Sequence, residues 1–127
     1  IKGNIISLRA IENSDSRNYH KWINDEDTNQ WRGLYMPSSK KAATKWIKDR
    51  KKENKEQLNL SIETTKGEHI GFIGLQNIAN RSQRAEIWIY IGSKKYWSKG
   101  FGKDSIKTLC DYAVSYTHLT LPTSDLV

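Results

Sequence analysis

The chain has 127 residues, 36% of them hydrophobic, which is enough for one globular domain with its own core. It has no long apolar run and only one cysteine, which excludes a membrane span and an internal disulfide, so we expect a cytoplasmic protein without a membrane partner. Its three histidines are scattered, so we expect no metal site, and the net charge of +7 suits either nucleic acid or a polyphosphate cofactor.

The first part of the chain predicts one strand followed by two helices. Residues 5–11 are rich in branched apolar side chains, which favours a β-strand. Apolar residues recur at helical spacing in residues 16–24 and again after Ser38 or Ser39, either of which can cap the second helix. The expected buried stripes are Tyr19, Trp22 and Ile23 in the first helix and Ala42, Ala43, Trp46 and Ile47 in the second.

The second helix continues into a basic run, residues 48–55. Acidic residues are interspersed in this run, so we interpret it as a solvated helix face. Nucleic-acid binding by this face is the less favoured alternative, since a basic helix without base-reading or stacking groups is common in proteins that bind no nucleic acid.

Three strands are predicted next, at residues 58–64, 70–78 and 85–91, joined by short turns. In the third strand one face is aliphatic throughout, whereas the other face carries Glu86, Trp88 and Tyr90. Because both faces carry apolar groups, we expect this strand to be central in the sheet and covered from both sides.

The stretch Tyr-Trp-Ser-Lys-Gly-Phe-Gly-Lys, residues 96–103, lies between the third strand and a helix-like run at 104–112. Gly100 and Gly102 let the backbone turn tightly and bring its amides close to a ligand. The positive end of the following helix and the charges of Lys99 and Lys103 make a diphosphate the natural guest.

Two other phosphate-binding loops do not fit this stretch. A Walker A loop would need Gly at Trp97 and Ser or Thr at Asp104, and a dinucleotide fingerprint would need a third glycine at Ser105. The helix that follows has a buried stripe that includes Cys110, which we interpret as a core residue rather than a nucleophile.

The order of elements, together with the pattern Trp97-x-x-Gly100-x-Gly102, resembles the Gcn5-related N-acetyltransferase (GNAT) family. The family signature is Gln/Arg-x-x-Gly-x-Gly/Ala, and the Trp at its first position is similar to the branch that includes ribosomal-protein and spermidine acetyltransferases. The resemblance implies an α/β (α+β) chain with the acyl-CoA N-acyltransferase fold, in which helices flank a mixed central sheet. It covers residues 5–113 and implies that the fold is incomplete at the C-terminus.

The resemblance also implies acetyl-CoA as cosubstrate, no metal, and an amine as acceptor: a small molecule, a polyamine or a protein N-terminus. In the family, pantetheine pairs with the open edge of the central strand and the pyrophosphate binds the loop. The cofactor-binding residues implied in this way are Trp88, Ile89, Tyr90, Ile91, Trp97, Ser98, Lys99, Gly100, Phe101, Gly102 and Lys103. A homodimer is considered for the full-length parent.

Glu86 is the candidate base that takes the ammonium proton, because it lies on the central strand, on the face away from the aliphatic row. The alternative, weighted equally, is a structural carboxylate that pairs with Arg84 or Arg81. The family's acceptor pocket maps onto the segment between the first two helices, although solvated loop acids are an alternative there. The residues concerned are Asp25, Glu26, Asp27, Trp31 and Tyr35.

Residues 114–123 resemble the translation of a sequencing-library adapter, so we expect a GNAT domain at 1–113 and a non-native tail at 114–127. The alternative is a short natural strand at 117–121. The usual catalytic tyrosine would lie beyond this point, so we expect the fragment to be inactive alone.

The competing function is a non-enzymatic module that grips single-stranded nucleic acid through the lysines and aromatic residues of 94–103. Such a module would have no need for the two glycines.

Overall fold

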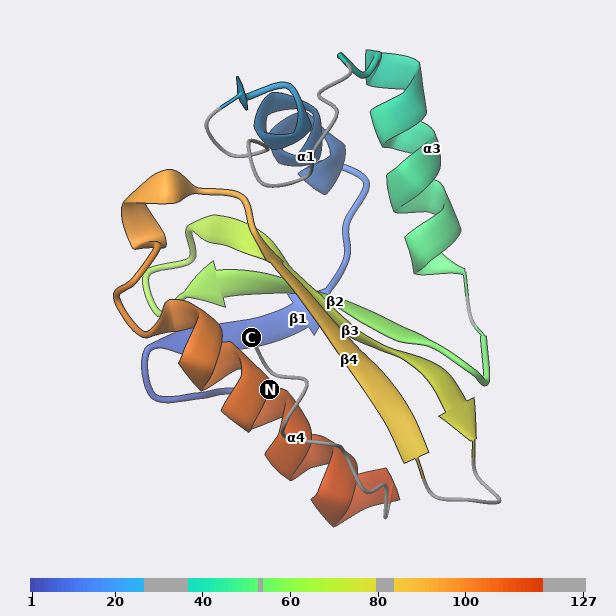
Figure 1. Cartoon of the computed structure of the whole chain (residues 1–127), viewed down its shortest axis with the longest axis vertical. Helices are drawn as coiled ribbons and strands as arrows, with labels where there is room; N and C mark the ends of the chain where they lie inside the picture. The colour runs from blue at the N-terminus through green and yellow to red at the C-terminus, as the bar shows by residue number, and fades with distance from the viewer. Residues whose placement is uncertain (27–36, 53, 80–83, 118–127) are drawn as a thin grey trace.

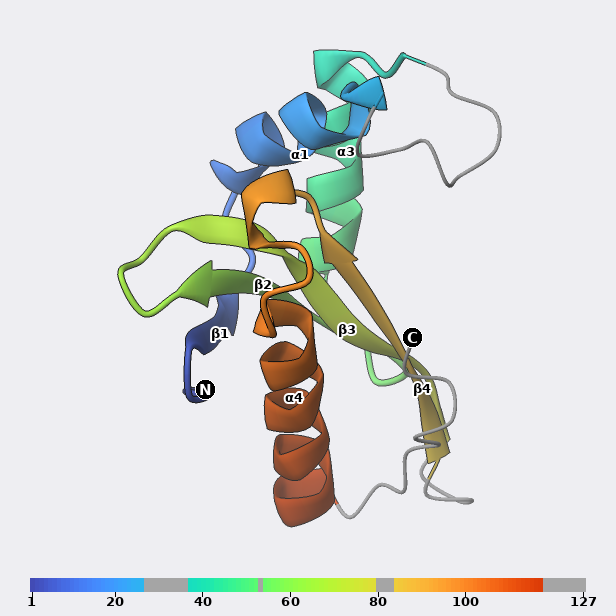
Figure 2. The same cartoon turned by 60° about the vertical axis from the view of Figure 1, so that its left-hand side comes forward.

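The computed structural model describes residues 1–26, 37–52, 54–79 and 84–117 (Figure 1). Four antiparallel strands form one sheet in the order β1 (Ile6–Ala10), β2 (Leu58–Thr64), β3 (His69–Ala79) and β4 (Arg84–Ile91). Helices α1 (Asp15–Ile23) and α3 (Lys40–Lys51) lie on one side of the sheet, and α4 (Phe101–Thr117) lies on the other (Figures 1 and 2). We expected a mixed sheet, and the strand pairs within the described ranges are all antiparallel.

Each side of the sheet has its own core. On the α4 side the buried residues are aliphatic, with Ile73 and Leu75 of β3 packed against Leu109 and Ala113 of α4. On the other side the core is largely aromatic and gathers Tyr19 and Trp22 of α1, Ala43 and Ile47 of α3, and Phe72 of β3. This arrangement confirms that β4 is covered on both faces, because Ile87, Ile89 and Ile91 pack against the first core and Trp88 and Tyr90 against the second.

Most predicted elements are confirmed to within two residues, but several details are wrong. In the described residues β4, expected in the centre of the sheet, lies at its edge, and the basic run 48–55 is helical only as far as Lys51. Ala42, expected in the buried stripe of α3, is exposed, because it lies in the first turn, where its amide donates to the capping Ser39 hydroxyl at 3.0 Å. The last helix begins at Phe101 rather than Asp104, so Phe101, Gly102 and Lys103 form its first turn instead of the loop.

A buried ion pair joins β1 to α1. The carboxylate of Asp15 accepts two hydrogen bonds from the Arg9 guanidinium, both 2.9 Å, and one from the Ser61 hydroxyl at 2.7 Å. Burial alone would raise the pKa of Asp15, but these bonds and the Glu12 amide overcome it and hold the pKa at about 2. His69 lies 3.5 Å from the same carboxylate, and burial lowers the pKa of its imidazole.

A second carboxylate fixes the start of α4. Asp104 accepts hydrogen bonds from the backbone amides of Asn4, Ile5 and Ile6 at 3.2, 2.8 and 3.1 Å. These bonds tie the first turn of α4 to the segment that leads into β1.

In the part of the chain that the structure describes, no helix combines the length and the apolar character needed to cross a membrane. Within the same residues, no group of three or more His, Cys, Asp and Glu side chains is placed to hold a metal ion. The helix α4 continues past Ala113 to Thr117, and residues 118–127 lie outside the described ranges, so the boundary after residue 113 stays a prediction.

Candidate cofactor site at the end of β4

The chain leaves β4 through a short 3-10 helix, Lys94–Tyr96, and a turn that leads into α4. The turn contains two residues with left-handed backbone conformation, Ser98 with φ 59° and Gly100 with φ 86°. The amide of Asp104 donates to the Gly100 carbonyl at 3.0 Å, and this bond begins the helix. Gly100 is therefore required for its backbone conformation, since a side chain there would be strained even though nothing lies within 4 Å of its Cβ position.

The turn and the start of α4 present six consecutive backbone amides, those of residues 98–103. None of the six donates a hydrogen bond to a residue that the structure describes. The last three are amides of the first turn of α4, where the helix dipole adds positive potential, and the exposed side chains of Lys99 and Lys103 add positive charge. This combination can bind a phosphate or diphosphate.

The edge of β4 that faces away from β3 leads directly to this turn. The Gly92 amide donates to the Ile70 carbonyl at 3.0 Å, toward β3, whereas the Ile91 carbonyl points the other way and accepts from the Trp97 indole at 2.7 Å. Because backbone groups alternate along an antiparallel strand, those of Ile89 point outward with those of Ile91. They offer a donor and an acceptor to an extended ligand.

Contacts from both sides of the sheet fix the position of the turn. A Cβ at Gly92 would lie 2.1 Å from the ring of Trp22, so the chain passes directly over the α1 side of the core. A Cβ at Gly102 would lie 3.8 Å from Ile89 and 3.9 Å from Ile91, which places the start of α4 against the other face of β4. The contact between Trp22 and Gly92 was not predicted from the sequence, in which a glycine directly after the strand is its local sign.

The 3-10 helix is also bonded to the turn between β2 and β3. Tyr96 donates to the Glu68 carboxylate, and the Lys95 ammonium lies 3.0 Å from the same group. The hydrogen bond to Glu68 raises the pKa of Tyr96, and the Tyr96 and Lys95 contacts lower the pKa of Glu68.

Glu86 lies near the opposite end of β4, exposed, with its carboxylate held by two amides. Gln76 donates to it at 3.3 Å and Asn77 at 2.9 Å. Asn77 reaches it because the β3–β4 register is irregular between Gln76 and Ala79, where Asn77 has a φ of 53°. Of the two expected ion-pair partners, Arg84 makes no ion pair with Glu86, and Arg81 lies outside the described residues.

The predicted acceptor residues are only partly placed by the structure. Asp25 forms an ion pair with Lys94 at 3.2 Å, which links the end of α1 to the start of the cofactor turn. Glu26 is exposed. The remaining candidates, Asp27, Trp31 and Tyr35, lie outside the described residues.

Comparison with known proteins identifies the family to which the chain belongs. Residues 6–124 match the family model of the acetyltransferase (GNAT) domain. This range includes most of the segment that we interpret as a tail, and that interpretation remains a prediction. No curated protein matches the chain significantly.

Solved structures share the fold at low sequence identity. Spermidine N-acetyltransferase from Vibrio cholerae, in complex with CoA and spermine, superposes with a TM-score of 0.73 at 23% identity, covering 90% of this chain and 66% of that chain. A Vibrio cholerae protein proposed to be a ribosomal-protein-serine acetyltransferase gives 0.78 at 17%, covering 95% and 70%. The microcin C7 self-immunity acetyltransferase, in complex with acetyl-CoA and AMP, gives 0.73 at 18%, covering 89% and 65%. The chain therefore spans about two thirds of the length of these proteins and has their fold, as expected from the sequence.

Proposed function

Because the chain belongs to the acetyltransferase (GNAT) family, we propose that it binds acetyl-CoA and that the parent protein transfers the acetyl group to a primary amine. The observation that carries this proposal is the row of six backbone amides at residues 98–103 that find no acceptor among the described residues. A diphosphate would satisfy several of them at once, which a nucleic-acid base stacked on the same turn would not.

The remaining cofactor contacts that we propose follow from this placement. With the diphosphate on residues 97–103, the pantetheine arm would run back along the open edge of β4, from Ile91 toward Trp88. The outward backbone groups of Ile89 would bond its amides, and the Ile91 carbonyl is already engaged by Trp97. The distance from Ile91 back to Glu86 is roughly 17 Å along an extended strand, so a long flexible arm is needed to bring the thioester near that carboxylate.

The proposed reaction is direct transfer. The amine nitrogen forms a bond to the acetyl carbon, and an outward amide of β4 supports the negative charge on the carbonyl oxygen. The carbon–sulfur bond then breaks, and coenzyme A leaves as its thiolate, which takes up a proton from water. Glu86 accepts the proton that leaves the nitrogen, directly or through water. Its two amide partners hold the carboxylate in place without supplying a cation that would weaken it as a base.

The proposal includes a contribution to the acceptor site from the segment between α1 and α3, which carries Asp25, Glu26, Asp27, Trp31 and Tyr35. It also includes a cytoplasmic location, which the free thiol of Cys110 supports, and a homodimer for the full-length parent.

Titration calorimetry with coenzyme A tests the cofactor site, because β4, the turn and α4 are all present in this chain. We expect one molecule of coenzyme A to bind per chain. If a short oligonucleotide binds instead, with no heat from coenzyme A, and binding survives Gly100→Trp, the nucleic-acid module replaces the acetyltransferase.

The role of Glu86 is tested by Glu86→Gln, which keeps the shape of the side chain and can still accept from Asn77. We expect acetylation of an amine to slow by roughly a hundredfold or more, with coenzyme A affinity unchanged. Glu56→Gln, which changes an exposed carboxylate elsewhere on the molecule, is the control. An unchanged rate in Glu86→Gln would reduce Glu86 to a structural partner of Gln76 and Asn77.

A further inference from the structure

We propose that the acceptor amine carries an anionic group, a carboxylate or a phosphate, and that Arg50 binds this group while the amine approaches Glu86. The inference rests on the proposed function and specifies the acceptor, which neither the fold nor the family determines. It is carried by the surroundings of Arg50 in the last turn of α3.

Arg50 is half-buried and preoriented. Its guanidinium lies 4.7 Å from the centre of the Trp46 ring, and Trp46 is itself stacked on Tyr19 at 4.1 Å with an interplanar angle of 11°. The nearest acid in sequence, Asp49, is engaged by Lys52 at 3.6 Å, and the guanidinium pairs with no carboxylate among the described residues. A planar donor group fixed on an aromatic ring and lacking a counter-ion is suited to a two-bond contact with a carboxylate or phosphate.

A pocket of about 140 Å³ opens beside this guanidinium, between α3 and the neighbouring face of the sheet. Its lining offers one cation, three side-chain amides and two indole rings, and no described acidic side chain. The lining residues are Trp46, Arg50, Gln57, Asn59, Gln76 and Trp88.

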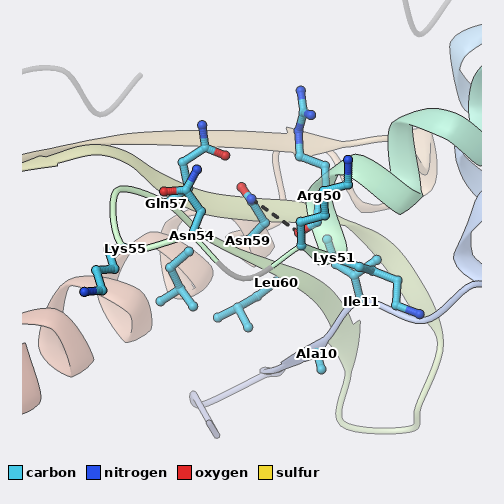
Figure 3. Close-up of a pocket in the computed structure, with 11 residues that line it drawn as sticks. Ala10, Ile11, Arg50, Lys51, Asn54, Lys55, Gln57, Asn59 and Leu60 are labelled. Atoms are coloured by element: carbon cyan, nitrogen blue, oxygen red, sulfur yellow. Dashed lines mark hydrogen bonds between the residues drawn. The ribbon is translucent and has the colours of Figure 1, made fainter.

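A larger pocket, of about 700 Å³, adjoins the first and shares Arg50, Gln57 and Asn59 with it (Figure 3). In Figure 3 the Arg50 side chain points away from the apolar side of this pocket, which Ala10 and Leu60 form. Lys51, Lys52 and Lys55 also line the larger pocket, so the potential around Arg50 is positive on this side as well.

The small pocket is connected to the candidate base. Gln76 lines the pocket and donates to Glu86 at 3.3 Å, and Trp88, also in the lining, lies on the same face of β4 as Glu86. The Glu86 carboxylate is not part of the lining but lies next to it, bonded to the Gln76 side chain, whereas Arg50 is part of the lining. An acceptor with its anionic group at Arg50 can therefore extend past Gln76 and bring its amine to Glu86.

This arrangement disfavours a polyamine, because the second ammonium of a polyamine would meet Arg50. No carboxylate among the described residues lines this pocket to offset that charge. An amino acid, an acidic peptide end or a phosphorylated amine matches both Arg50 in the pocket and Glu86 beside it.

The test compares four-carbon ligands that differ in the second charge. Binding of 4-aminobutyrate and of 1,4-diaminobutane to the whole chain, without coenzyme A, is followed through tryptophan fluorescence, because Trp46 and Trp88 line the pocket. We expect 4-aminobutyrate to bind more tightly and Arg50→Gln to weaken its binding roughly tenfold to a hundredfold. Lys45→Gln removes the same charge from an exposed position of α3 that lines neither pocket, and should change nothing.

Arg50→Lys provides a second variant, which keeps the charge and loses the planar fork. It should weaken 4-aminobutyrate binding by less than Arg50→Gln does. If Arg50→Gln fails to fold, this variant shows whether Arg50 binds the anionic group. Substituting 3-aminopropyl phosphate for 4-aminobutyrate shows which anion is preferred.

The inference is overturned if the diamine binds as tightly as 4-aminobutyrate, if neither ligand binds, or if the Arg50 variants leave 4-aminobutyrate binding unchanged. Failure of the proposed function is separate from these outcomes and would appear as the absence of coenzyme A binding in calorimetry.

Discussion

The two ends of β4 are built from different parts of the chain. At the end that leads into α4, the candidate ligand-binding groups are backbone amides and the outward edge of the strand, and the side chains mainly fix the turn in place. At the other end they are side chains, Glu86 from β4, held by two amides of β3, and Arg50 from α3, which lies over the Trp46 ring of the same helix. A main-chain site can be kept through large changes in sequence, whereas a side-chain site can change its ligand by one substitution.

The largest loss of stability is expected from a substitution at Gly92, where the chain passes over the core. Gly92→Ala would place a methyl group 2.1 Å from the buried ring of Trp22, so strand and helix must separate. We expect the free energy of unfolding to fall by about 3 kcal/mol, measured by urea denaturation. Coenzyme A affinity should fall too, since the start of the turn moves, and unchanged affinity would show that the main-chain site does not depend on this contact.

A matched pair of glycines tests the main-chain site more directly. Gly100 and Gly67 have nearly the same left-handed backbone, φ 86° and 87°, and nothing lies within 4 Å of either Cβ position. Gly100→Val and Gly67→Val therefore carry the same backbone strain, but only Gly100 lies in the candidate cofactor turn. We expect coenzyme A to bind Gly100→Val roughly thirtyfold more weakly and Gly67→Val normally, by calorimetry. Equal losses in both variants would place the cofactor elsewhere.

Acid should lower the stability of the fold through the buried ion pair of Asp15 and Arg9, which joins β1 to α1. The pKa of Asp15 is about 2 in the folded state and close to 3.8 in an unfolded chain, so the unfolded state takes up the proton first as the pH falls. The ion pair contributes its full stability above about pH 4 and loses it between about pH 4 and pH 2, on the order of 2 kcal/mol. Denaturation curves over this range should show the loss in the native sequence and a smaller one in Asp15→Asn. Equal slopes would mean that Asp15 is not ion-paired in solution.

Sequence periodicity predicted much of the fold, because strands such as 58–64 and the aliphatic face of β4 carry their signal in adjacent residues. The turn was predictable for the same reason, since Gly100 and the following helix are local features. What the sequence could not reveal depends on residues far apart in the chain. The contact of Trp22 with Gly92 and the wall that Arg50 shares with Gln76 and Trp88 both exist only once α1, α3 and the sheet have come together.

The hydrogen bonds of Asp104 have a practical consequence. The helix that shapes the diphosphate turn is attached, through one carboxylate, to the amides of Asn4, Ile5 and Ile6. Deleting residues 4–6 would therefore loosen a helix that begins almost a hundred positions later. A version of the domain shortened in this way should lose coenzyme A affinity even though every residue of the turn is retained.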